Sequence, residues 1–444
     1  MEKIGGICKT TFNYNDFAGK EDQIVTIEGF VHRIREMTGF SFVLIRTKRD
    51  VIQCIYAPEF SDFRWDHKIV EGCAVKVTGK VAKSQDAKGN DRYEVQIHDV
   101  EVLSTPAEQM PIVINKKTLD NVPLNTALDL RPISLRNPCE RAVFKIQEGI
   151  AKGFREALYK KEFTEIRTPK INYGNAEGGA GVFTLDYFGK QVFLATSPQL
   201  YKQTMVGVYE RVFEVGPVFR AEKHDTSRHL NEYVSMDFEM GFIDSFKDIM
   251  EMETYVLKYI FDLLKKDYAP ELELLHANMP EITEIPTIKF MDAKDLIINK
   301  FHKKITDFRD FEPEEEQLIG QWAKKEYGSD FIFVTHYPSE KRPFYAMDDP
   351  EDPKYTLSFD LLFRGVEITT GGQRIHSYNM QVQKMKDRGL NPDDFESYLM
   401  LHKYGAPPHG GLGLGLERLT MNLLGFKNVR YASMFPRDIN RVTP

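Results

Sequence analysis

Two arginines stand at either end of a short polar loop, Arg220 and Arg228. Strand-like sequence lies on both sides, 211–219 before the loop and 233–238 after it. A guanidinium group is always charged, and its planar fork of donors matches phosphate oxygens. The segment therefore predicts a strand–loop–strand that holds phosphates. An exposed hairpin with surface ion pairs is the alternative for an isolated pair of arginines.

A pair of carboxylates, Asp360 and Glu367, forms a second group of candidate residues. A two-residue turn at 364–365 would pair Leu362 with Glu367 across a hairpin. Cross-strand partners share a face, and Asp360 shares that face with Leu362, so both carboxylates should converge. Two carboxylates and the phosphates of ATP are a common Mg²⁺ site. The alternative is an edge hairpin with two solvated acids.

A third group is a glycine-rich run that leads into an apolar helix and contains Arg418. Bare backbone at Gly411, Gly413 and Gly415 would let a flat adenine or ribose approach closely. ATP activates a carboxylic acid when the carboxylate attacks the α-phosphorus, which requires positioning and charge stabilisation rather than an acid or base. Arginines and metal-binding carboxylates fit this chemistry, and the sequence has no nucleophilic serine or cysteine motif.

These segments resemble the motifs of the class II aminoacyl-tRNA synthetases, and they occur in the family's order. The stretch 163–171, with Pro169, resembles motif 1; 219–240 resembles motif 2, and 410–419 resembles motif 3. Between the first two, 196–203 is similar to the amino-acid pocket of the aspartyl-tRNA synthetases. The resemblance covers nearly the whole chain and looks closest to the archaeal and eukaryotic branch.

The resemblance implies an aspartate–tRNA ligase that needs Mg²⁺. Such an enzyme makes aspartyl-adenylate from L-aspartate and ATP, then transfers the aspartyl group to the 3′ end of tRNA(Asp), with tRNA(Asn) left open as a second substrate. It implies catalytic roles for Arg220, Glu367 and Arg418. The implied ATP-binding residues are Arg220, Ala221, Glu222, Arg228, His229, Leu230, Glu367, Gly415, Leu416, Glu417 and Arg418.

The resemblance also implies how the amino acid is chosen. Lys202 and Arg374 match the pair that binds the β-carboxylate of aspartate, and the asparaginyl enzymes lack that lysine. The implied aspartate-binding residues are Glu177, Ser197, Gln199, Leu200, Tyr201, Lys202, Arg220, Asp237, Thr370 and Arg374. The implied metal ligands are Glu367, Thr370 and Asp360. Archaeal relatives have Ser where this chain has Thr370, and Thr keeps the hydroxyl. Glu177 lies in a glycine-rich segment that resembles the family's flipping loop, which closes over aspartate.

The N-terminal region reads as a five-stranded β-barrel of the OB-fold type. A short helix is expected at roughly 61–70. The resemblance implies that this barrel binds the tRNA anticodon through Phe42 and Gln53, with His32 as the residue found in members that charge two tRNAs. Another small barrel without an RNA role is the alternative. The expected strands are 24–35, 40–46, 51–56, 74–83 and 91–103.

The whole chain is expected to be α+β, with the barrel joined to a class II catalytic domain whose antiparallel sheet is flanked by helices. Apolar periodicity predicts helices at 141–161 and 246–266, and Pro and Glu in the first turn predict a third at 313–327. The expected boundaries are residues 1–105 for the anticodon-binding domain, 106–132 for a linker, and 133–444 for the catalytic domain, with an insertion at about 267–340.

Composition limits the alternatives further. The 444 residues carry a net charge of −7, so RNA binding would need a local basic surface. The four cysteines have no metal-site spacing, and no stretch reads as a signal peptide or membrane span, so we expect a reduced, cytoplasmic protein. A homodimer through 163–171 is expected from the resemblance. An asparaginyl-tRNA synthetase and a non-catalytic, synthetase-like RNA-binding protein are the alternative functions.

Overall fold

The computed structural model describes residues 14–65, 68–85, 89, 91–173 and 181–444. The chain divides into two compact units, which are described separately. Unit 1 is Met1–Asn121 with Pro132–Asn137, and unit 2 is Val122–Arg131 with Pro138–Pro444. None of the helices in the described ranges combines the length and apolarity needed to cross a membrane.

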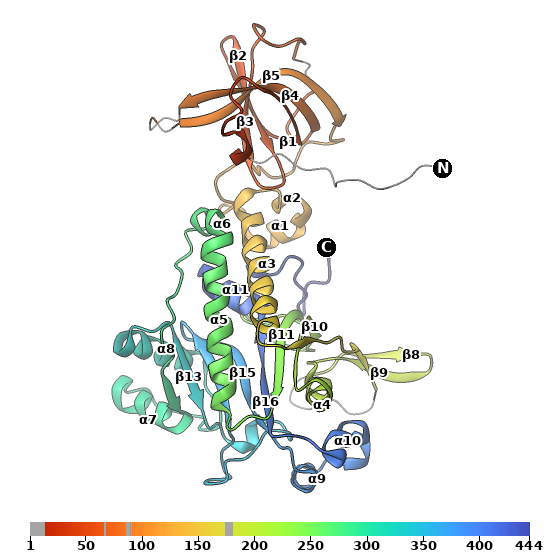
Figure 1. Ribbon diagram of the computed structural model, residues 1–444, viewed down its shortest axis with the longest axis vertical. Coiled ribbons are helices and arrows are strands. Elements are labelled where there is room, and N and C mark those ends of the chain that lie inside the picture. The colour runs from red at the N-terminus through yellow and green to blue at the C-terminus, as the bar shows by residue number, and fades with distance from the viewer. Residues whose placement is uncertain (1–13, 66–67, 86–88, 90, 174–180) are drawn as a thin grey trace. The chain divides into compact units, whose positions relative to one another are not determined.

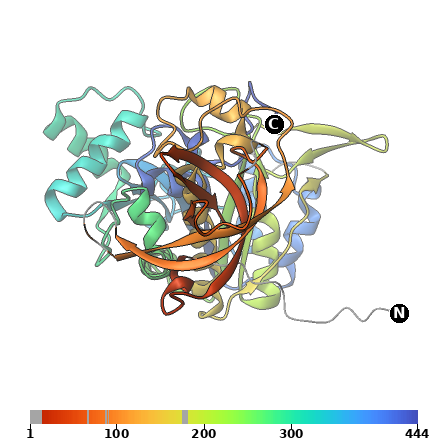
Figure 2. The same ribbon diagram turned by 90° about the horizontal axis from the view of Figure 1, so that it is seen from above.

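Unit 1 is the predicted five-stranded barrel, closed in the order β1-β2-β3-β5-β4 (Figure 2). Alternate residues of each strand point inward and form one apolar core, as strands with a single buried face require. The expected strands are confirmed to within two residues at each end. Their bounds are β1 Ile24–Met37, β2 Phe40–Arg46, β3 Val51–Tyr56, β4 Ala74–Gln85 and β5 Asp91–Ser104.

The helix expected at 61–70 is wrong for the residues described there, 61–65 and 68–70, which form turns and bends. Side chains tie this segment to the barrel in place of helical hydrogen bonds. Ser61 Oγ donates to the carbonyl of Ile97 at 2.6 Å, and the backbone N–H of Trp65 donates to Tyr56 Oη at 3.0 Å. The aromatic rings of Tyr56, Phe63 and Trp65 pack together beside the barrel core.

Unit 2 is built on an eight-stranded sheet that is antiparallel except at its two edges, where β12–β13 and β6–β10 are parallel. A small sheet, β7-β9-β8, lies beside it (Figure 1). In sheet order the large sheet comprises β12 Thr287–Lys289, β13 Phe331–Thr335, β14 Ser358–Phe363, β15 Val366–Arg374, β16 His409–Gly415, β11 Glu232–Gly241, β10 Arg211–Phe219 and β6 Thr164–Glu165. The small sheet comprises β7 Ile171–Asn172, β9 Lys190–Leu194 and β8 Thr184–Tyr187.

Two long helices, α3 (Pro138–Tyr159) and α5 (Lys247–Asp267), lie side by side across one face of this sheet (Figure 1). Both were predicted from their apolar periodicity, and both contribute to the largest buried core together with the inward residues of the strands. The other helices are α1 Leu124–Asp129, α2 Arg131–Ser134, α4 Gln199–Tyr209, α6 Ala269–Leu274, α7 Phe290–Phe301, α8 Pro313–Tyr327, α9 Tyr378–Asp387, α10 Glu396–Tyr404 and α11 Leu416–Leu424.

The stretch 267–340, expected as an insertion, contributes strands to the large sheet. It supplies the edge strands β12 and β13, and α7 and α8 pack beside them around a second apolar core. Helix α8 spans the predicted residues, 313–327. This stretch therefore forms one edge of the large sheet in unit 2.

The face of the large sheet that is turned away from α3 and α5 borders a cavity, and the alternation of side chains along each strand decides which residues reach it. On β11, Met236 and Phe238 enter the core below α3 and α5, whereas Ser235 and Asp237 face a cavity. Gly413 on β16 pairs with Asp237 on β11 at one side and with Thr370 on β15 at the other. A Cβ at Gly413 would lie 3.0 Å from Asp237 Oδ1, so glycine keeps this row of three residues open at its centre.

Candidate functional site

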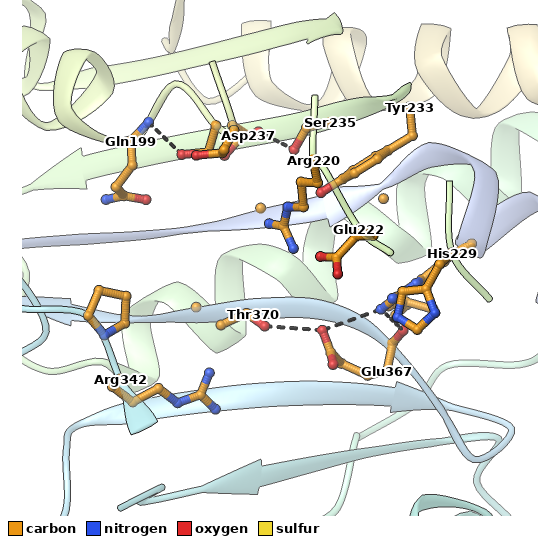
Figure 3. Close-up of a pocket in the computed structure, with 18 of the residues that line it drawn as sticks. Gln199, Arg220, Glu222, His229, Tyr233, Ser235, Asp237, Arg342, Glu367 and Thr370 are labelled. Carbon is orange, nitrogen blue, oxygen red and sulfur yellow. Dashed lines mark hydrogen bonds and ion pairs between the residues drawn. The ribbon is translucent and has the colours of Figure 1, made fainter. Parts of the chain in front are cut away.

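A cavity of about 380 Å³ opens on this face of the sheet. Its walls come from the β10–β11 hairpin, the β14–β15 hairpin, β16 with the start of α11, the segment 196–199 at the start of α4, and the chain at 341–346. Figure 3 shows Arg220, Glu222 and Asp237 on one side of the space, with Arg342 and Glu367 on the other. More Lys and Arg than Asp and Glu side chains line the cavity, which suits a polyanionic ligand.

The loop between β10 and β11 is braced by its own side chains. Asn231 Nδ2 donates to the carbonyl oxygens of Arg220 and Glu222, at 2.7 and 3.1 Å. The guanidinium of Arg220 lies 5.7 Å from the centre of the Tyr233 ring, which keeps it over the cavity. At the far end of the loop, the imidazole of His229 shares a hydrogen bond of 2.6 Å with Thr226. Burial, followed by the charge of Arg418, lowers the pKa of His229.

Glu367 is held through its backbone N–H, its backbone carbonyl and one carboxylate oxygen, which positions its side chain at the cavity wall. Thr370 Oγ1 donates to Glu367 Oε1 at 3.2 Å, and Arg418 Nη1 lies 3.5 Å from the same oxygen. The same Arg418 nitrogen donates to the carbonyl of Glu367 at 3.2 Å. The backbone N–H of Glu367 donates to Glu316 Oε2 at 3.2 Å.

The predicted register of the β14–β15 hairpin is confirmed, since Leu362 pairs with Glu367. A bulge follows, so Asp360 pairs with Thr370 rather than Thr369. Asp360 lies behind the cavity wall, where Arg342 Nη2 contacts its Oδ1 at 2.8 Å. Burial raises the pKa of Asp360 to about 6; the charge of Arg342 opposes this rise and the charge of Glu367 adds to it.

The donor set of this hairpin fits Mg²⁺. Magnesium takes one or two carboxylates and keeps phosphate and water oxygens as its other ligands. Glu367 and the hydroxyl of Thr370 face the cavity, and Asp360 lies across the strand pair from Thr370. Within the described ranges no three Asp, Glu, His or Cys side chains form a metal cluster.

Four buried charges lie at the other end of the cavity. Lys202 Nζ donates to Asp237 Oδ1 at 2.9 Å and to the carbonyl of Leu412 at 2.8 Å. It also lies 3.4 Å from Glu239 Oε2, and Arg374 Nε donates to Glu239 Oε1 at 2.9 Å. Burial raises the pKa of Glu239, but the charges of Arg374 and Lys202 outweigh it, and the pKa lies below its ordinary value.

Most of the predicted site residues meet in this one cavity. Those in its lining are Ser197, Gln199, Arg220, Glu222, Arg228, His229, Leu230, Asp237, Glu367, Thr370, Arg374, Gly415, Glu417 and Arg418. Those outside the lining are Leu200, Tyr201, Lys202, Ala221, Asp360 and Leu416. Tyr201 is partly exposed and donates to Asn172 Oδ1, whereas Lys202 lies directly behind Asp237. Glu177 lies outside the described residues.

The predicted anticodon residues belong to unit 1. Phe42 is partly exposed on β2, with its ring 5.2 Å from that of Phe40 in an edge-to-face contact. Gln53 on β3 donates to Glu94 Oε2 at 3.0 Å. His32 is only 5% exposed, so in this conformation its side chain presents no open edge to a base.

Several cavity residues were missed in the sequence. Tyr233 and Ser235 are the alternating partners of Asp237 on β11, so strand periodicity could have identified them. Lys341, Arg342 and Tyr345 come from an irregular stretch after β13 that carries no periodic signal. Glu316, which lies behind the lining and contacts Arg228 and Glu367, was also missed, because an acidic first turn is already explained by the start of the helix.

Comparisons with known proteins agree with this geometry. Residues 123–439 match the family model of class II tRNA synthetases (D, K and N), and residues 25–103 match that of the OB-fold nucleic acid binding domain. The aspartate–tRNA(Asp/Asn) ligase of Deinococcus radiodurans is 46% identical over 96% of both chains. The enzyme of the same name from Thermus thermophilus is 43% identical, over 97% of this chain and 99% of its own.

Solved structures give the same result. The asparaginyl-tRNA synthetase of Pyrococcus horikoshii, complexed with asparaginyl-adenylate, superposes with a TM-score of 0.87 at 29% identity, over 96% of this chain and 97% of its own. The aspartyl-tRNA synthetase of Entamoeba histolytica gives 0.83 at 28% identity, over 98% and 93%. With its catalytic unit and its barrel both matched, the chain belongs to the class II aminoacyl-tRNA synthetases, in the group of the D, K and N enzymes.

Proposed function

We propose that this protein is an aspartate–tRNA ligase. The observation that carries the proposal is the meeting of Arg220, Arg418 and Glu367 around one cavity, with the buried cations Lys202 and Arg374 at its other end. The names of the relatives support the choice of aspartate, since those at 46% and 43% identity are aspartate–tRNA ligases.

In the first step, an α-carboxylate oxygen of aspartate bonds to the α-phosphorus of ATP and pyrophosphate leaves. We assign the α-phosphate to Arg220 and the distal phosphates to Arg228 and Arg418, all three of which line the cavity. Fixed charges in a partly enclosed site need no reorganisation as the phosphate oxygens gain charge, which lowers the barrier. Bound Mg²⁺, held by Glu367 and Thr370 with Asp360 behind them, would supply further neutralisation of the phosphates.

Amino-acid choice is assigned to the buried charges. Arg374 lines the cavity and would meet the β-carboxylate of aspartate directly, and Lys202 would add positive charge from behind Asp237. Asparagine offers an uncharged amide to the same groups and would leave the cations less well paired. Ser197, Gln199 and Asp237 line the same end and would orient the amino group.

In the second step, a 3′-terminal ribose hydroxyl of the tRNA attacks the carbonyl of the adenylate, and AMP leaves. We assign the anticodon to unit 1, where Phe42 would stack on a base and Gln53 would bond to one. The burial of His32 does not favour a base contact by this residue. A homodimer through 163–171 completes the proposal.

The test is aspartate-dependent exchange of pyrophosphate into ATP, with asparagine as the competing substrate. We expect exchange with aspartate and at least about a hundredfold less with asparagine, because the site is built around a charge. Arg220→Ala should reduce exchange by about a hundredfold, the cost of losing one transition-state donor. A preference for asparagine would make the protein an asparaginyl-tRNA synthetase instead.

Charging of tRNA(Asn) is a second candidate activity. It is favoured by one observation: the relatives at 46% and 43% identity, and a third from Aeropyrum pernix at 41%, are all aspartate–tRNA(Asp/Asn) ligases. Aspartylation of each purified tRNA by the full chain would test it. Equal charging of both tRNAs is the expected result, and charging of tRNA(Asp) alone would exclude this second activity.

A further inference from the structure

On helix α8, Glu316 contacts two residues that line the cavity. Glu316 has a side chain that is 11% exposed, and its carboxylate forms an ion pair with Arg228. The same oxygen accepts the backbone N–H of Glu367 at 3.2 Å. Both partners line the cavity, whereas Glu316 lies behind them. None of the groups assigned to the reaction above comes from α8.

The position of Glu316 is set by how tightly α8 sits on the turn of the β14–β15 hairpin. Gln317 Nε2 donates to the carbonyl of Gly365 at 2.7 Å. One turn further along the helix, a Cβ at Gly320 would lie 2.5 Å from the backbone nitrogen of Gly365. Gly365 itself has φ +73°, a conformation suited to glycine. These contacts hold α8 closely against the turn of the hairpin.

A carboxylate that pairs with an arginine restricts the orientation of the guanidinium group. Pairing at one part of the guanidinium orients the plane of the group and leaves other N–H donors to face the cavity. Without a partner, the flexible Arg228 side chain would have to be ordered by the ligand itself, which reduces affinity. Burial raises the pKa of Glu316 to about 7, the charge of Glu367 adds to this effect, and the charge of Arg228 opposes it.

We propose that Glu316 is a positioning residue that aims Arg228 at the distal phosphates of ATP, and that α8 is thereby part of the nucleotide site. The packing of α8 on the hairpin turn and the hydrogen bond from the N–H of Glu367 fix the position of the Glu316 carboxylate. The ion pair with Glu316 then fixes the orientation of the Arg228 guanidinium. This inference rests on the proposed function, in which those phosphates occupy the end of the cavity lined by Arg228 and Arg418.

The experiment compares Glu316→Gln with Glu314→Gln in the full-length chain. Both change an acid to its amide in the first turn of α8, but Glu314 is exposed and pairs with Lys303. Calorimetric titration with ATP and with AMP is the main readout. We expect Glu316→Gln to bind ATP about tenfold more weakly, as for the loss of one charged hydrogen bond, and to bind AMP normally because AMP lacks the distal phosphates. Glu314→Gln should match the unaltered chain in both titrations.

Arg228→Ala, alone and combined with Glu316→Gln, shows whether Glu316 acts through Arg228. The double variant should bind ATP no more weakly than Arg228→Ala, and KM for aspartate in pyrophosphate exchange should stay unchanged in Glu316→Gln. Glu316→Asp should recover part of the ATP affinity, since it restores the charge on a shorter side chain.

Unchanged ATP affinity in Glu316→Gln, equal weakening of ATP and AMP, or additive losses in the double variant would each overturn the inference. Failure of the proposed function would be seen differently, in the unaltered chain. That chain would then bind no ATP or show no aspartate-dependent exchange.

Discussion

Four buried charged side chains balance one another at the end of the cavity that the proposed function assigns to the amino acid. Lys202 and Arg374 face Asp237 and Glu239, all four of them buried, so two positive charges meet two negative ones. Such a group tolerates the loss of one member poorly, because the remaining charge stays buried without its partner.

Replacing Lys202 with Met should test this balance. We expect the free energy of unfolding to fall by about 3–5 kcal/mol, the cost of breaking a buried pair. Urea denaturation followed by circular dichroism measures the change. The control is Lys145→Met on α3, where a partly exposed lysine pairs with Glu148, and there the loss should be about 1 kcal/mol or less. Similar losses in both variants would show that the buried cluster does not depend on its lysine.

A second prediction at this scale concerns His409, which is fully buried on β16 beside Gln203. Burial lowers its pKa from 6.5 to about 4. Between these two values the unfolded chain binds a proton that the folded chain does not, so stability falls as the pH drops through this window. At pH 5 the loss from this one group should be about 2 kcal/mol relative to pH 7.5.

His409→Gln removes the titrating group and leaves an amide beside Gln203. Urea unfolding of both proteins should be measured at about pH 7.5 and about pH 5. The free energy of unfolding that is lost between these two pH values should be about 2 kcal/mol smaller in the variant. Subtracting the pH-dependent change of the variant from that of the unaltered chain cancels the contribution of the carboxylates, which both chains share. An equal acid-induced loss in both would mean that His409 already binds its proton in the folded protein.

At the scale of elements, the contact between α8 and the β14–β15 turn positions the hairpin that carries Glu367. Gly320→Ala would place a methyl group 2.5 Å from the backbone nitrogen of Gly365, which cannot rotate away as a side chain could. We expect a loss of about 1–3 kcal/mol in unfolding free energy, as for overpacking elsewhere, and a raised KM for ATP. Gln321→Ala, an exposed change on the same helix, should alter neither. Normal stability in Gly320→Ala would show that the helix can shift along the turn.

The sequence predicted elements better than it predicted their contacts. The start of α8 followed from Pro313 and the acidic first turn, and the turn at 364–365 predicted the pairing of Leu362 with Glu367. The bulge that moves Asp360 opposite Thr370 has no local signal, because it depends on how β15 fits between two neighbouring strands. Glu316 was missed for a related reason: an acid near a helix start is already explained by the helix dipole.

At the scale of the whole molecule, the two units divide the proposed reaction. The cavity lies entirely within unit 2, while the residues assigned to the anticodon lie in unit 1. Adenylate formation needs no tRNA in the proposed mechanism, so changes on the barrel surface should leave it intact. Transfer to tRNA should depend on both units.

Phe42→Ala is the change that separates the two steps. Stacking of a base on an aromatic ring contributes about 1–3 kcal/mol, so kcat/KM for tRNA in aminoacylation should fall by about 5- to 150-fold. Pyrophosphate exchange, measured on the same preparation, should stay within about twofold of the unaltered chain, since it depends on the cavity of unit 2. Val102→Ala, which shortens a partly exposed apolar side chain on β5 of the same barrel, serves as the control and should affect neither assay. If Phe42→Ala reduced exchange as much as aminoacylation, the barrel would contribute to the catalytic unit itself and the division of labour would be wrong. If it reduced neither, the anticodon would have to be read by another surface.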